Sequence, residues 1–189
     1  MSDKQLAKIE RLLGDICKTQ TALCEKLEAL ERRGAGGSGA ATCEETVAFL
    51  DQFRANEAAA VNWIGAWIEN SDVACVRGGL RTVQQRESMH AQLLESRIKE
   101  LGGSCTYQVP EADRKRYLET FGGTACSDAE KVKALVEEVG DCDAFLKPFD
   151  EFANRLDGDP ETQFLLRTIV QDERSTIQFL NDACAMLNG

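Results

Sequence analysis

The chain has 189 residues, of which 43% are hydrophobic and 29% are charged, so its length fits one ordinary domain with an additional segment. Its formal net charge of −10 argues against binding to nucleic-acid phosphates. No apolar stretch approaches the roughly 18 residues that a membrane-spanning helix needs, and the N-terminus lacks the apolar core of a signal peptide. We therefore expect a soluble, cytoplasmic protein that has neither nucleic acid nor membrane as a partner.

Residues 1–33 are predicted to form a helix with the heptad pattern of a coiled coil. Apolar residues recur at alternating spacings of three and four between Leu6 and Leu30, and Gln20 is the one polar residue at these heptad positions. Such a helix could join copies of the chain into a homo-oligomer, or it could pack against its own domain. The pattern leaves both alternatives open.

The rest of the chain is predicted to be all-α. Residues 34–41 are rich in glycine and predict a flexible linker, and residues 42–189 carry the periodicity of long helices. Four helices are expected in this bundle, at residues 42–70, 71–101, 127–156 and 160–187, with a kink at Pro148 in the third. Short connections join the helices into two antiparallel hairpins, and a long crossover, 102–126, joins the hairpins.

An internal repeat supports this division into two halves. Residues 80–87 align with residues 166–173, and the alignment continues at the same offset to Gln92 and Leu94. The two predicted hairpins therefore look like copies of one unit.

Polar residues interrupt the apolar stripe of each predicted helix near its middle. Glu57 lies on the first helix, and Glu87 lies on the second, three residues before His90, the only histidine of the chain. Asp143 and Glu173 lie in the same way on the third and fourth helices. Glu57 precedes Glu87 by 30 residues, and Asp143 precedes Glu173 by the same number, so antiparallel pairing predicts that the four carboxylates meet in one layer. Such a buried layer requires protonation, arginines or metal cations to balance its charge.

This pattern resembles the ferritin-like di-iron carboxylate proteins, and the helix layout is similar to that of rubrerythrins and demethoxyubiquinone hydroxylases. In that family each hairpin supplies one Glu and then a Glu-x-x-His pair. The resemblance implies that Glu57, Glu87 and His90 are the metal ligands of a complete half-site. Asp143 and Glu173 belong to a second, degenerate half-site, in which Thr176 stands where the second histidine is expected.

Two function classes follow from these residues. The first is a metal-binding ferritin-like protein that holds iron, manganese or zinc through Glu57, Glu87, His90, Asp143 and Glu173, with redox catalysis, metal storage and metal sensing as open alternatives. The second is a degenerate bundle that has lost the metal and serves as a non-catalytic scaffold or as an oligomerisation or partner-binding module. The sequence leaves open whether the protein is an enzyme.

The remaining distinctive residues are given structural interpretations. Trp63 and Trp67 are expected to be core aromatics, and Glu137 and Glu138 are expected to lie on a solvated helix face. The eight cysteines have no metal-binding or redox spacing, so we expect mostly reduced thiols.

Overall fold

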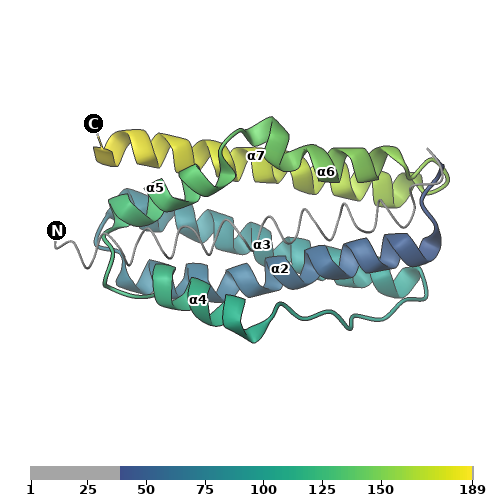
Figure 1. Ribbon diagram of the computed structural model, residues 1–189, viewed down its shortest axis with the longest axis horizontal. Helices are drawn as coiled ribbons and strands as arrows, with labels where there is room; N and C mark the ends of the chain where they lie inside the picture. The colour runs from purple at the N-terminus through teal and green to yellow at the C-terminus, as the bar shows by residue number, and fades with distance from the viewer. Residues whose placement is uncertain (1–38, 189) are drawn as a thin grey trace.

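The computed structural model describes residues 39–188, and within that range it contains six helices and no strand (Figure 1). The all-α prediction is therefore confirmed for this part of the chain. The predicted coiled-coil helix at 1–33 and most of the linker that follows it lie outside the described residues.

The first hairpin has nearly the predicted boundaries. Helix α2 (Cys43–Asn70) begins after Thr42, whose hydroxyl accepts a hydrogen bond from the backbone N–H of Glu45, while the Glu45 carboxylate accepts one from the N–H of Thr42. A short turn leads into α3 (Ala74–Glu100), which runs back along α2 (Figure 1). Gly102, with φ of 76°, follows the end of α3, as expected of a residue that reverses the chain.

The crossover runs along the outside of α2 and contains one more helix, α4 (Glu111–Phe121) (Figure 1). Its extended first part is fixed by the buried carboxylate of Asp51, which accepts hydrogen bonds from the backbone N–H groups of Thr106 (2.7 Å) and Tyr107 (2.6 Å). This contact brings the following helix alongside α2.

The second hairpin departs from the predicted layout, because residues 127–156 form two helices. Helix α5 (Asp128–Val139) ends at Gly140, which has φ of 59°, and α6 (Cys142–Asn154) begins after Asp141. The side chain of Asp141 accepts a hydrogen bond from the N–H of Ala144 and so caps the new helix. The predicted single helix with a kink at Pro148 is therefore wrong: Pro148 lies inside α6, and the break lies at Gly140. Both helices pack against α7 (Pro160–Asn188).

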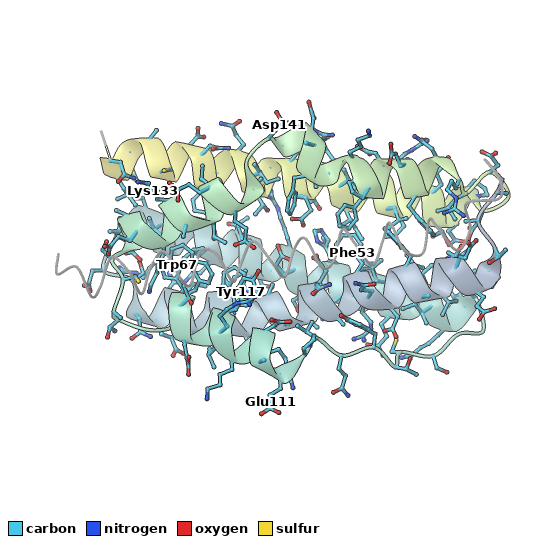
Figure 2. All side chains as sticks on the ribbon, in the orientation of Figure 1. Phe53, Trp67, Glu111, Tyr117, Lys133 and Asp141 are labelled. Carbon is cyan, nitrogen blue, oxygen red and sulfur yellow. The ribbon has the colours of Figure 1, made fainter. Side chains whose placement is uncertain are left out.

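Three apolar clusters form the core of the described residues. One, around Leu146, Val170 and Ile177, lies between α6 and α7, and the other two lie between the hairpins, one toward each end. The first of these two surrounds Phe53, Leu94 and Ile169, and the second surrounds Ile64, Val83 and Trp67. Figure 2 places Phe53 and Trp67 between the two layers of helices. Trp67 is fully buried, in agreement with its predicted core role.

The middle of the bundle between these clusters is polar. Along α2, Glu57 lies between Phe53 and Ile64, and along α3, Glu87 and His90 lie between Val83 and Leu94. The apolar clusters thus close off both ends of a buried polar layer.

Two smaller predictions bear on the described residues. None of the helices in residues 39–188 has an apolar stretch long enough to cross a membrane. Six of the eight cysteines are described, and these six form no disulfide with one another.

Candidate metal centre

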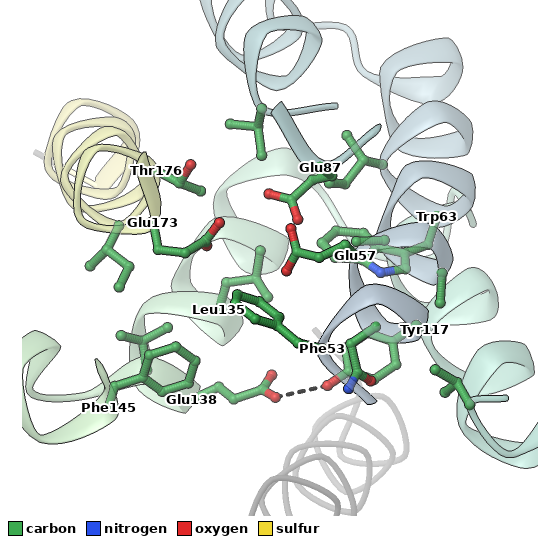
Figure 3. Close-up of a pocket in the computed structure, with 18 of the residues that line it drawn as sticks. Phe53, Glu57, Trp63, Glu87, Tyr117, Leu135, Glu138, Phe145, Glu173 and Thr176 are labelled. Carbon is green, nitrogen blue, oxygen red and sulfur yellow. Dashed lines mark hydrogen bonds between the residues drawn. The ribbon is translucent and has the colours of Figure 1, made fainter. Parts of the chain in front are cut away.

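Four polar side chains from three helices converge in the middle of the bundle. Glu57 of α2, Glu87 and His90 of α3, and Glu173 of α7 each place one potential ligand atom within 4.8 Å of the others. Figure 3 shows the carboxylates of Glu57, Glu87 and Glu173 pointing toward one another. His90 is fully buried, and Glu57 and Glu87 are each 6% exposed. The structure therefore brings together four of the five residues that the sequence singled out.

His90 contacts carboxylates through both ring nitrogens. Its Nδ1 lies 3.0 Å from Oε2 of Glu57 and 3.5 Å from Oε1 of Glu173, and its Nε2 lies 3.1 Å from Oδ2 of Asp172. Burial acts to lower the pKa of His90, but the interactions with Glu173 and Asp172 outweigh it and raise this pKa above its ordinary value. The imidazole is therefore oriented by a carboxylate on either side.

The two carboxyl groups of the first hairpin resist ionisation. Burial, followed by the charge of Glu173, raises the pKa of Glu57 well above its ordinary range. Burial and the charges of Glu57 and Glu173 do the same to the pKa of Glu87. Glu57 and Glu87 also share a hydrogen bond, which requires a proton on one of them. The cluster therefore holds more acidic groups than one imidazole can neutralise, and it needs bound protons or a cation.

The carboxylate of Glu173 has an oxygen without a hydrogen bond. Its Oε1 is buried and makes no hydrogen bond among the described residues. Thr176 lies beside it on α7, and the hydroxyl oxygen of Thr176 is likewise buried without a hydrogen-bond partner (Figure 3). These two oxygens are available to a bound species.

Asp143 does not join the cluster. It lies in the first turn of α6, with its side chain 84% exposed, and it forms an ion pair with Arg174. The prediction of a layer of four carboxylates is therefore wrong in this member. Its physical reason is the break at Gly140. The prediction assumed one continuous helix over residues 127–156, whereas α6 starts anew after Asp141, so the helical period of α5 does not carry over to Asp143.

Thr176 occupies the position that the repeat assigns to a second histidine. It is buried next to Glu173, but a hydroxyl is a weak ligand for iron or zinc. The first hairpin thus provides three donor groups, and the second provides only the carboxylate of Glu173.

Sequence reasoning missed Asp172. This residue precedes Glu173 on α7 and reaches His90 on α3, so its role depends on how the two hairpins pack. A partial signal was present, because a metal-bound histidine generally donates its second N–H to a carboxylate or carbonyl group.

Glu138 was assigned to a solvated face, and that prediction is wrong, although its neighbour Glu137 is exposed as expected. Oε1 of Glu138 accepts a hydrogen bond of 2.9 Å from the hydroxyl of Tyr117, drawn in Figure 3, and its Oε2 is buried without a partner. Burial raises the pKa of Glu138 to about 7, against the opposing effects of Tyr117 and Arg116. Leu135, one turn earlier on the inner side of α5, was the available signal that Glu138 also faces inward.

A cavity of about 300 Å³ adjoins the cluster. Glu57, Glu87 and Glu173 belong to its lining, and Glu138 lines it as well. Most of the remaining lining is aromatic or aliphatic and comes from all the helices of the described residues. The cluster therefore lies against an apolar space instead of being packed in on every side.

The donor set of three carboxylates and one imidazole suits iron, manganese or zinc. No family model, no curated protein and no solved structure matches the chain.

Proposed function

We propose that the chain is a metal-binding, ferritin-like protein in which Glu57, Glu87, His90 and Glu173 bind one iron, manganese or zinc ion. The observation that carries the proposal is the convergence of four ligand atoms within 4.8 Å in a buried layer between the hairpins. Each of these residue types is an established ligand for these metals.

The charges of the cluster fit a cation. A divalent or trivalent ion would replace the protons that burial and mutual repulsion otherwise force onto Glu57 and Glu87. It would also give a closer partner to Oε1 of Glu173, which lies 3.5 Å from Nδ1 of His90 but makes no hydrogen bond. Nδ1 of His90 faces the carboxylates while Asp172 holds Nε2, which is the orientation expected of a histidine that binds metal through its first nitrogen.

We propose one ion rather than the pair that is typical of the di-iron proteins. The second half-site lacks its histidine, because Thr176 is in that position, and lacks its second carboxylate, because Asp143 lies at the surface. Two helical hairpins joined by a long crossover support a ferritin-like arrangement. Iron or manganese would supply redox chemistry with oxygen or peroxide, whereas zinc would supply a Lewis acid.

A second candidate is a bundle that works without metal, as a scaffold or oligomerisation module. The observation in its favour is that both nitrogens of His90 already have carboxylate partners. With a proton shared between Glu57 and Glu87, an imidazolium at His90 would balance much of the remaining charge.

The test that separates the two candidates is metal binding by the full chain. We expect protein purified without chelator to contain close to one equivalent of metal by elemental analysis. After removal with a chelator, Fe(II) without oxygen, Mn(II) or Zn(II) should raise its melting temperature, because ligand binding to the native state alone stabilises it. A matched variant, Glu87→Gln with Glu173→Gln, should lose both effects. Absence of metal and of any shift in the wild type would favour the scaffold.

A further inference from the structure

The cavity beside the carboxylate cluster is a pocket that reaches from the interior of the bundle to the exposed Arg114. Its volume of about 300 Å³ falls at the lower end of the range, about 300–1,000 Å³, that is typical of small-molecule sites. Protein interiors are otherwise packed so closely that voids larger than a water molecule are rare. A partly open pocket of this size beside a buried polar cluster has room for a small ligand.

The side chains that line the cavity favour an apolar ligand that contains a ring. Phe53, Trp63 and Tyr117 contribute aromatic rings from α2 and α4, and Phe145 and Phe149 contribute two more from α6. Aromatic rings favour stacked and edge-to-face contacts with other rings. The break at Gly140 separates α5, with Glu138, from α6, with Phe145, at this wall.

Besides the oxygens of Glu173 and Thr176, one further carboxyl oxygen of the cavity lining lacks a hydrogen-bond partner. Oε2 of Glu138 is buried and has no partner, whereas Oε1 is already engaged by the hydroxyl of Tyr117 (Figure 3). A buried acceptor without a partner costs free energy, and a ligand with an O–H or N–H donor would recover it. Above its pKa of about 7, Glu138 is ionised and can only accept a hydrogen bond, so at such a pH it selects a ligand that donates one.

The charge of the lining excludes anions. Glu57, Glu87, Glu138 and Glu173 all line the cavity. Even with protons held on Glu57 and Glu87, the lining stays negative through Glu173 and, above pH 7, through Glu138. At its outer end the exposed Arg114 and the nearby Asp113 carry opposite charges. A ligand that carries a carboxylate or phosphate would therefore be repelled from the interior.

We propose that this cavity binds a neutral, apolar ring compound that donates one hydrogen bond to Glu138 and lies against the carboxylates of Glu57, Glu87 and Glu173. If the compound is also the substrate of the metal centre, that role rests on the proposed function. Binding of the compound to the cavity is independent of the metal, because the lining and Glu138 are present without it.

The test uses three naphthalene probes and the full chain after treatment with a chelator. 2-Naphthol has a ring and a donor, 2-methylnaphthalene has the ring alone, and 2-naphthoate carries a negative charge. Calorimetric titration at pH 8, where Glu138 is mostly ionised, should give saturable binding in the order 2-naphthol, 2-methylnaphthalene, 2-naphthoate. The gap between the first two should be at least about tenfold, as expected of one hydrogen bond to a charged group.

Substitutions in the cavity lining test whether the probes bind in this cavity. Glu138→Leu should abolish the preference for 2-naphthol over 2-methylnaphthalene while leaving the second probe bound. Ala60→Phe, which fills the lining from α2, should weaken both probes at least tenfold, and Ala185→Phe on the exposed end of α7 should change neither. Circular dichroism checks the helical fold of each variant. If Ala60→Phe does not fold, the probe preference of Glu138→Leu is the deciding measurement.

The outcomes separate this inference from the metal proposal. Lack of saturable binding, unchanged binding to a folded Ala60→Phe variant, or an unchanged probe preference in Glu138→Leu would overturn the inference, even if metal binds. Probe binding as expected in a protein that takes up no metal would leave the ligand cavity standing and overturn the metal centre instead.

Discussion

Nε2 of His90 lies 3.1 Å from Oδ2 of Asp172, and this contact joins α3 of the first hairpin to α7 of the second. It leaves Nδ1 of the same ring directed at Glu57 and Glu173. The position of the imidazole is thus fixed from the side opposite the proposed metal.

Asp172→Asn is expected to lower metal affinity about 10- to 100-fold, the usual cost of losing the carboxylate behind a metal-bound histidine. The amide keeps the size of the side chain but loses its charge, so the ring is held less firmly. Calorimetric titration with Zn(II) measures the change. Asp182→Asn, an exposed substitution on the same helix, is the control and should have wild-type affinity. Equal affinity in the two variants would remove Asp172 from the site.

His90→Ala is expected to lower metal content much more than Thr176→Ala. His90 is the only imidazole of the chain, whereas a hydroxyl contributes little to the binding of iron or zinc. Elemental analysis of both variants, purified side by side with the wild type, gives the comparison. If both hold as much metal as the wild type, the metal lies elsewhere in the protein.

Asp143→Ala is expected to leave metal content unchanged. Its ion pair with Arg174 lies at the surface, where such pairs contribute about 0–1 kcal/mol, so the free energy of unfolding should fall by no more than about 1 kcal/mol. Elemental analysis and urea unfolding measure the two quantities. Glu173→Ala is the contrasting variant and should lose metal. A loss of metal in Asp143→Ala would mean that α6 moves to bring this carboxylate inward.

Glu138→Gln is expected to change how stability depends on pH in the metal-free protein. Burial raises the pKa of Glu138 from the ordinary 4.5 to about 7, so between these pH values the native state holds a proton that the unfolded state releases. The stability gained by this group is complete below pH 4.5 and is lost as the pH rises through 7.

The glutamine variant does not titrate. Between pH 4 and pH 8 its free energy of unfolding should therefore rise relative to that of the wild type by up to about 3 kcal/mol. Urea unfolding across this range gives the difference. Glu137→Gln, at the exposed neighbouring position, should follow the wild-type curve throughout. A constant gap between Glu138→Gln and the wild type at all pH values would show that the pKa of Glu138 is the same in the native and unfolded states.

The first hairpin could be predicted well because its determinants are local. Thr42 and Glu45 form the expected capping box, and Gly102 follows the end of α3. A short turn fixes α2 against α3, so the helical period alone places Glu57, Glu87 and His90 on facing sides.

The second hairpin was less predictable because one residue changed its geometry. Gly140 is a signal for the end of a helix, and Asp141 is a signal for the start of the next. The apolar periodicity continues across both residues, however, and this predicted a single helix. Asp143 lost its predicted place as a result. The roles of Asp172 and Glu138 depend on how the two hairpins and α4 settle against each other, which no local pattern determines.

The uneven division of ligands between the hairpins has a consequence for assembly of the protein. Glu57, Glu87 and His90 all belong to α2 and α3, which pair along their length, whereas α3 meets α7 over a shorter stretch. The first hairpin can therefore gather three donors as soon as it forms during synthesis, before α7 exists. Glu173 completes the set only when the second hairpin docks. An ion bound by the first hairpin would therefore favour docking of the second, because Glu173 is its fourth ligand.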